Sequence, residues 1–193
     1  MIIDNSFEVG MAPGRALDVL TDVPLVAPCI PGVTLTEVLG GDSYRGTAAV
    51  RLGPVALAFA GTARLVAIDR EAGTVRVEAE GADEKGRGRA RANVTFALSP
   101  AGPGTRVDVR SEVTLTGQVA QYGRASGLIG EVANQIIGDF TRNLAAKLAA
   151  DAPRSGPAAA PPTGRKQEIS GLRVLLRAIW AMIARLLHRP DRR

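Results

Sequence analysis

The sequence predicts an α+β fold in which a curved antiparallel sheet of about seven strands surrounds one long helix. Two observations lead to this prediction. From residue 33 onward, apolar and polar residues alternate with a period of two for about eighty residues, interrupted only by short turn sequences. After Gly117 the period of the apolar residues becomes 3.6 until about residue 150, which is typical of one long helix of about 25–30 residues.

The elements follow one another in an order that the turn residues define. Residues 2–9 alternate as a first strand, and Pro13 opens a short helix, since proline is favoured in a first helical turn. Three prolines then leave room for no more than one further helical turn, at positions 24, 28 and 31. Six more strands are predicted, at residues 33–39, 43–52, 55–69, 74–81, 88–99 and 105–116.

The alternation assigns side chains to two faces of this sheet. In the fifth strand, Arg76, Glu78 and Glu80 alternate with valine and alanine. Arg87, just before the sixth strand, falls on the polar side with Arg89 and Arg91 of that strand. The residues on the other side are small or apolar: Gly88, Ala90, Ala92, Val94, Phe96 and Leu98. A sheet with one solvent-exposed (wet) face and one buried face is typical of an antiparallel meander. Carboxylates suited to acid–base work are expected only on the wet face.

Charge and composition divide the chain into three parts. Residues 1–150 form the predicted ligand-binding domain, with 15 Lys and Arg against 16 Asp and Glu, a net charge of −1. Residues 151–167 are rich in proline and alanine and are predicted to be a linker. From residue 151 to 193 there are 9 basic and 3 acidic residues, a net charge of +6. Because the excess positive charge lies on the tail and aromatic residues are scarce, we expect no nucleic-acid partner.

The segment 168–193 is predicted to form an amphipathic helix that lies on a membrane surface. Its apolar face is wide and its polar face is almost purely arginine, which suits a helix in a lipid headgroup layer and not a transmembrane span. A helix docked in a partner's groove or on its own domain is the alternative. The predicted membrane-binding residues are Leu172, Arg173, Leu176, Arg177, Ile179, Trp180, Ile183, Arg185, Leu186 and Leu187.

The inward positions of the sheet are unusually small. They include Gly46, Ala48, Gly61, Ala63, Ala79, Ala90 and Ala92, whereas an ordinary core opposite a long helix needs larger residues. Small residues here indicate either close packing of the helix or a cavity with apolar walls that suits a lipophilic ligand. The residues predicted to line such a cavity are Leu57, Phe59, Ala90, Ala92, Val94, Phe96, Tyr122, Ile129, Ile136 and Phe140.

Catalytic chemistry finds little support in the body of the chain. The single histidine, His188, lies in the tail, so a Ser-His-Asp or Cys-His site in the body is excluded, and no Cys/His cluster suits a metal. Cys29 is expected to be a small apolar residue that fills space in the core and not a reactive thiolate. Tyr122 is a candidate hydrogen-bond donor to a ligand carbonyl, as are Gln118 and Gln121, although Tyr122 equally suits an ordinary amphipathic position.

The first 150 residues resemble the CoxG family of carbon monoxide dehydrogenase accessory proteins, within the START/Bet v 1-like (SRPBCC) helix-grip superfamily. The likeness rests on four strings: VAPCIPGV (26–33), VRLGPVALAFAG (50–61), KGRGRARANVTF (85–96) and LTGQVAQYGRASGLIGEVANQIIGDFTRNL (115–144). The resemblance implies a non-catalytic carrier that binds menaquinone or another respiratory quinone. It also implies a partner, a molybdenum-containing carbon monoxide dehydrogenase or related hydroxylase, which the carrier links to the membrane respiratory chain.

Two other functions stay open at this stage. The chain is alternatively a membrane-recruitment scaffold for such a hydroxylase that carries no quinone, or, with least support, an enzyme of the polyketide cyclase type. One cysteine and an N-terminus without the pattern of a secretory signal indicate a cytoplasmic body. With the tail helix, the expected location is the cytoplasmic face of the cell membrane, as a peripheral protein.

Overall fold

Seven strands and one long helix account for most of residues 1–124 and 126–151, which are the residues described by a computed structural model of the chain. Two short helices and two 3-10 segments complete this part. In chain order the elements are β1 (Ile2–Val9), α1 (Pro13–Thr21), α2 (Val23–Val26), η1 (Ala27–Cys29), β2 (Val33–Gly40), β3 (Ser43–Leu52), β4 (Val55–Asp69), β5 (Thr74–Asp83), β6 (Gly88–Ala101), β7 (Gly104–Gly117), η2 (Gln118–Arg124) and α3 (Ser126–Asp151).

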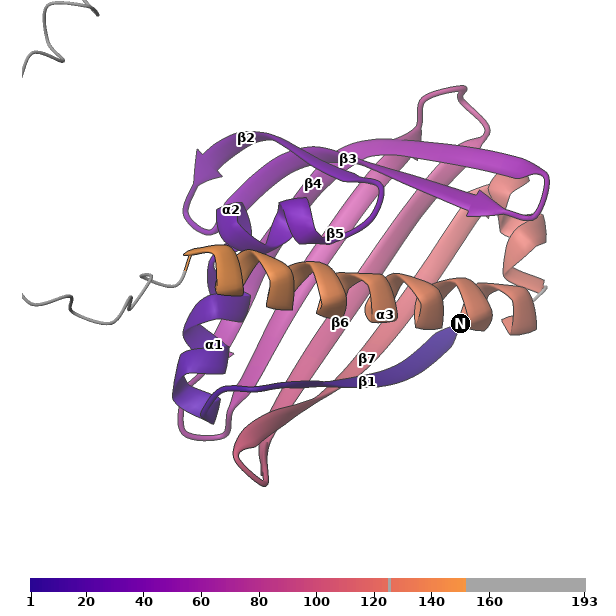
Figure 1. Cartoon of the computed structure of the whole chain (residues 1–193). Helices are drawn as coiled ribbons and strands as arrows, with labels where there is room; N and C mark the ends of the chain where they lie inside the picture. The colour runs from indigo at the N-terminus through magenta and orange to yellow at the C-terminus, as the bar shows by residue number, and fades with distance from the viewer. Residues whose placement is uncertain (125, 152–193) are drawn as a thin grey trace, which may run out of the picture. The chain divides into compact units, whose positions relative to one another are not determined.

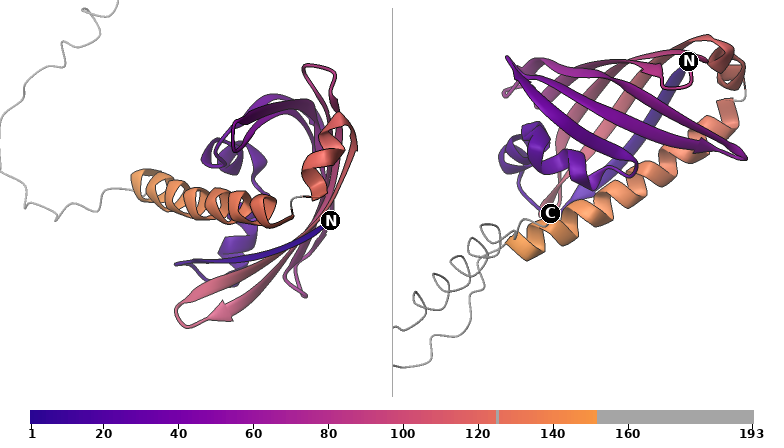
Figure 2. Two further views of the ribbon diagram at one scale, coloured as in Figure 1. Left: turned by 90° about the vertical axis from the view of Figure 1, so that its right-hand side faces the viewer. Right: turned by 90° about the horizontal axis from the view of Figure 1, so that it is seen from above.

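The strands form a single antiparallel sheet in the order β1-β7-β6-β5-β4-β3-β2. β2 to β7 are therefore a meander, and β1 adds to the edge at β7. The sheet curves around α3, which crosses the strands on the concave side (Figures 1 and 2). The predicted helix-grip architecture is confirmed.

The predicted alternation of faces also holds. Val75 in β5 and Val107 and Val109 in β7 are buried on the inner face, whereas the charged residues between them are exposed. The β-branched residues suit both the pleated backbone and the packing against α3.

The long helix begins later than expected. Gly117 ends β7 with a positive φ of 75°, a conformation that glycine adopts without strain, and the chain enters η2 instead of α3. η2 is held against the sheet because the Val119 side chain is fully buried and its N–H donates to the carbonyl of Arg87 at 3.2 Å. Tyr122 therefore lies in η2 and not in the long helix.

Apolar side chains gather in two separate clusters on the inner face. The first, the α1 cluster, joins α1 and η1 to the sheet and to the C-terminal half of α3, where the rings of Phe7 and Phe140 meet edge to face at 5.5 Å. Cys29 is buried in this cluster. The second, the η2 cluster, has Leu52, Leu57 and Val119 at its centre.

The predicted linker and tail helix lie outside the described residues, apart from Asp151 at the end of α3. The prediction of three parts, 1–150, 151–167 and 168–193, therefore stays a prediction. Within the described part of the chain, no helix is both long and apolar enough to cross a membrane.

Candidate ligand-binding site

Two rows of small residues cross the inner face between the α1 cluster and the η2 cluster. We call them the small-residue belt: Gly61, Gly81 and Ala90 are cross-strand neighbours in one row, and Ala63, Ala79 and Ala92 in the next. All six are only half-buried although they lie on the inner face. By contrast, the inward-facing Leu57 and Val107, in the clusters on either side, are 3% and 0% exposed. On the inner face these short side chains fill less volume than the leucines and valines of the two clusters. Gly61, Gly81 and Ala90 also border a hollow on the outer face, so their exposure includes that face.

The glycines of the inner face have a different role from the alanines. A Cβ added to Gly61 would lie 1.9 Å from the carbonyl oxygen of Glu80, and one added to Gly46 would lie 2.5 Å from that of Thr34. Both glycines are required because a neighbouring strand passes very close, and they do not create space for a ligand. Gly46 and Gly61 are therefore explained by close packing of the strands, whereas Ala79, Ala90 and Ala92 stay compatible with a cavity.

The ten predicted ligand-binding residues divide among these features. Leu57, Phe59, Tyr122 and Ile129 belong to the η2 cluster, and Val94, Phe96 and Phe140 belong to the α1 cluster or pack against it. Ala90, Ala92 and Ile136 belong to neither cluster, and all three are half-buried. These last three are not part of the packing within either cluster, and their contact with a ligand stays a prediction. Phe140, 7% exposed and packed on Phe7, is a core residue.

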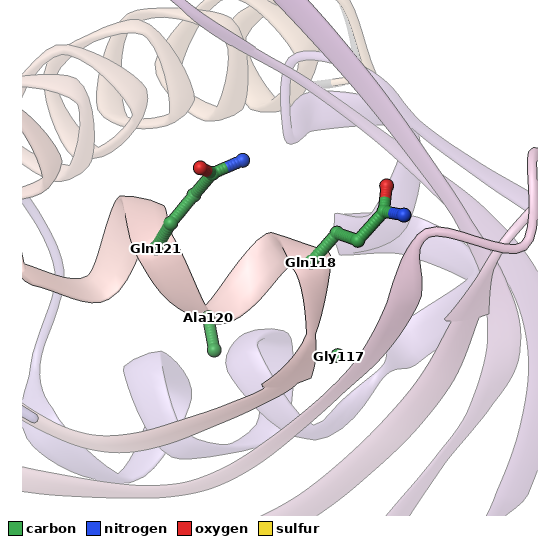
Figure 3. Close-up of a pocket in the computed structure, with 4 residues that line it drawn as sticks. All are labelled: Gly117, Gln118, Ala120 and Gln121. Carbon is green, nitrogen blue, oxygen red and sulfur yellow. The ribbon is translucent and has the colours of Figure 1, made fainter.

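A pocket of about 460 Å³ lies beside η2, lined by Gly117, Gln118, Ala120 and Gln121. Gln118 and Gln121 are exposed and point to the same side of η2, with Ala120 on the other side (Figure 3). Their amides are free to act as donors or acceptors at this pocket. None of these four residues is among the ten predicted, although both glutamines are predicted as candidate polar contacts.

Two phenols are half-buried near the belt. Tyr122 packs with the η2 cluster, and Tyr44 in β3 is the cross-strand neighbour of Ala63. Burial, with smaller contributions from the carboxylates of Asp42 and Asp22, raises the pKa of Tyr44, so its hydroxyl stays protonated and able to donate. Tyr44 is absent from the predicted residues, although it has the same parity in its strand as the inward-facing Gly46.

A buried ion pair closes the β5–β6 turn next to the η2 cluster. The guanidinium of Arg87 donates to both carboxylate oxygens of Asp83, at 2.8 and 2.7 Å, and to the carbonyl of Ala56 at 3.0 Å. The Asp83 side chain is 0% exposed and that of Arg87 is 24% exposed. The hydrogen bonds from Arg87 outweigh the effect of burial and hold the pKa of Asp83 far below its usual value.

This pair corrects two expectations. The alternation predicts Arg87 on the wet face with Arg89 and Arg91, and it predicts carboxylates only on that face. The geometry differs because Asp83 ends β5 on the inner face, opposite Phe59, and the turn brings Arg87 back over it. With both oxygens occupied, Asp83 is held as a structural anion and is poorly suited to accept a proton.

Replacing Asp83 with Asn is expected to lower the melting temperature more at neutral pH than in acid. Because the pKa of Asp83 is lowered on folding, the pair stabilises the fold above the ordinary carboxyl pKa of about 3.9 and loses this effect as the pH falls toward the folded-state pKa. Thermal unfolding of the wild type and of Asp83→Asn, from neutral pH to about pH 3, should show a difference in melting temperature that narrows as the pH falls below the ordinary carboxyl pKa. Asp108→Asn removes an exposed pair with Arg106 and should change little. Equal shifts for the two variants would contradict a special role for Asp83.

Within residues 1–124 and 126–151, no group of three or more His, Cys, Asp or Glu side chains is placed to hold a metal ion. Apart from the Asp83–Arg87 pair, the polar groups described above are hydroxyls and amides, which suit orientation of an uncharged ligand.

The model of the CoxG family, the G-type subunit of carbon monoxide dehydrogenase, matches residues 6–149, about three quarters of the chain. The chain belongs to this family. No curated protein matches the sequence significantly. The matched segment contains the belt, both clusters and η2, so every feature described above lies within the CoxG domain.

Solved structures show the same fold at low sequence identity. A conserved protein from Geobacillus kaustophilus is 21% identical with a TM-score of 0.66, covering 78% of this chain and 97% of its own. The Zhui aromatase/cyclase from Streptomyces sp. R1128 is 9% identical with a TM-score of 0.54, covering 81% and 98%. Ara h 8.0201 is 15% identical with a TM-score of 0.51, covering 77% and 98%. The CoxG domain thus has the Bet v 1-like helix-grip fold, and family and fold together indicate a ligand-binding carrier related to carbon monoxide dehydrogenase.

Proposed function

We propose that this CoxG protein is a non-catalytic carrier for a respiratory quinone of the menaquinone type. In this proposal it links a molybdenum-containing carbon monoxide dehydrogenase to the membrane respiratory chain. The observation that carries the proposal is the small-residue belt, whose short side chains lie between two apolar clusters under α3.

The chemistry of this space favours a long, mostly apolar ligand. Ala90, Ala92 and Ile136 offer apolar contacts with no charge, and the clusters on either side extend the apolar wall. A quinone adds two carbonyl oxygens at one end, and these accept hydrogen bonds. Tyr122, Tyr44 and the η2 glutamines supply donors at the edge of this space, so the ring would lie near one of them.

The ionisable groups near the space do not favour a reaction. The buried carboxylate, Asp83, is held by Arg87, and the described part of the chain contains no histidine. These features support a carrier over an enzyme of the cyclase type, with which the chain shares the fold alone.

Membrane attachment by residues 168–193 is the second part of the proposal. Its support is the charge of the tail, +6 against −1 for residues 1–150, and the wide apolar face of the predicted helix. A linker of residues 151–167 in an extended, proline-rich form reaches about 50 Å at roughly 3.1 Å per residue. This reach would let the domain visit a docked enzyme while the tail stays at the cytoplasmic face of the membrane.

The proposal is tested by what the protein holds when it is purified from its own cells. The full chain is extracted into organic solvent, and the extract is examined by mass spectrometry for a quinone in stoichiometric amount. We expect one isoprenoid quinone per chain. Extracts that contain only phospholipid, or no lipid, would contradict the carrier function and favour the recruitment scaffold.

A further inference from the structure

The outer face of the sheet has a hollow on the side opposite the belt. It holds about 390 Å³ and lies over β4, β5, β6 and β7. Its lining consists of outward-facing, exposed residues over a floor of small ones, and these are Ala60, Gly61, Thr62, Glu80, Gly81, Ala82, Arg89, Ala90, Arg91, Thr114 and Thr116.

Small residues create this hollow. The backbone of Gly61 and Gly81, two direct cross-strand neighbours whose Cβ positions face inward, forms part of its floor. One outward-facing row beside them is Ala60, Ala82, Arg89 and Thr116, in which the first two side chains are methyl groups. The sheet surface is therefore recessed at these alanines, with Arg89 and Arg91 on one side.

Arg89 differs from most arginines of this face. Five of them make ion pairs, namely Arg45–Glu37, Arg64–Glu78, Arg91–Glu80, Arg106–Asp108 and Arg110–Asp4. The cross-strand neighbours of Arg89 are Ala82 and Thr116, and within the described residues Arg89 makes no ion pair. Glu80 is the one carboxylate among the residues that line the hollow, and it pairs with Arg91. The five donors of the Arg89 guanidinium therefore have no carboxylate partner there.

We propose that this hollow is a docking site for an acidic segment of a partner protein. A carboxylate placed in it would receive two parallel hydrogen bonds from the Arg89 guanidinium, a geometry that arginine favours. The hydroxyls of Thr62, Thr114 and Thr116 offer further hydrogen bonds at the rim. The hollow has room for a few side chains of a loop, and its lack of large apolar residues does not suit insertion into a bilayer.

The position of the hollow separates a docked partner from the proposed ligand-binding site. A partner bound on the outer face would leave α3, η2 and the inner face of the belt uncovered, so docking and ligand exchange would not compete for one surface. Docking here goes beyond the proposed carrier function and does not depend on which ligand the belt holds.

The test is a titration of the ¹⁵N-labelled full chain with a hexaglutamate peptide, followed by NMR. Residue-resolved signals separate binding at the hollow from binding to the basic tail. We expect the amides of Thr62, Arg91, Thr114 and Thr116 to shift together and saturably, and Arg89→Gln to weaken this binding about tenfold, the factor that corresponds to one strong charged contact.

Arg76→Gln is the matched control, because Arg76 is exposed on the same face, makes no ion pair within the described residues and does not line the hollow. It should leave binding at the hollow within about twofold. Shifts confined to the tail, equal effects of the two variants, or equal shifts with inorganic phosphate, which would indicate a simple anion site, would each overturn the proposal.

Discussion

A chain that ends at Asp151 is expected to keep its fold and its bound ligand but to lose attachment to anionic bilayers. The cut leaves α3 whole, including the ion pair between Lys147 and Asp151 at 3.5 Å, and it removes the segment that carries the excess positive charge. Each arginine near an anionic surface contributes about 1 kcal/mol, and burial of the apolar face adds to this. Flotation with anionic vesicles should therefore recover the full chain and leave the shortened chain in the soluble fraction.

A second variant disrupts the apolar face while every arginine is kept. Leu176→Glu combined with Ile183→Glu keeps every arginine of the tail but places carboxylates within the predicted apolar face. Flotation should be lost for this variant too. If it floats like the wild type, charge alone attaches the tail, and the amphipathic helix is not the anchor.

The same shortened chain should fail in the cell. A quinone with a long isoprenoid chain is nearly insoluble in water, so a carrier must receive it at the bilayer, and the tether keeps the local concentration of the domain at the surface high. Oxygen consumption driven by carbon monoxide, in cells that carry the chain ending at Asp151, should fall to the level of cells without the protein. Full respiration in these cells would show that the tail is dispensable.

The sheet was predictable because most of its residues alternate, and register shifts interrupt the pairing only in the β2–β3 and β4–β5 ladders. In β5, the valines at 75 and 77 and the alanine at 79 all point inward, as their parity in the sequence indicates. Turn residues then mark the strand ends closely enough to give the meander. Where a single periodic signal determines an element, the sequence alone was sufficient.

η2 was not predictable for a physical reason. Gln118 to Arg124 continues the apolar spacing of the helix that follows, so periodicity alone merges the two. Their separation depends on the burial of Val119 between strands that are distant in sequence and on its hydrogen bond to Arg87. Both are tertiary contacts, and they override the local pattern.

The candidate site was predictable in part. The parity of Ala90 and Ala92 placed them correctly on the inner face, but parity does not distinguish a small residue that leaves space from one that a close strand requires, as at Gly61. Asp83 and Arg87 were missed because alternation does not extend through a turn. An Asp four residues before an Arg across a glycine-containing turn, DEKGR, is the signal that would have indicated the pair.

Ala92→Leu is expected to exclude the ligand without loss of stability. Ala92 lies between Ala79 and Val113 on the inner face and is half-buried, so in the carrier proposal the added side chain extends into the space that the ligand occupies. Filling a void is neutral or stabilising, whereas overpacking a filled core costs about 1–3 kcal/mol. The quinone recovered per chain should therefore fall sharply, while the melting temperature stays unchanged or rises.

Two control variants distinguish a ligand cavity from a close-packed core. Ala97→Leu makes the same change on the same strand at an exposed outward position and should leave both ligand content and melting temperature unaltered. Gly46→Ala should lower the melting temperature, because its new methyl group would meet the Thr34 carbonyl at 2.5 Å. A fall in melting temperature for Ala92→Leu as large as that for Gly46→Ala would mean that the belt is a close-packed core. An unchanged ligand content in Ala92→Leu would place the ligand elsewhere, because a leucine at this position occupies the space that the proposed isoprenoid chain requires.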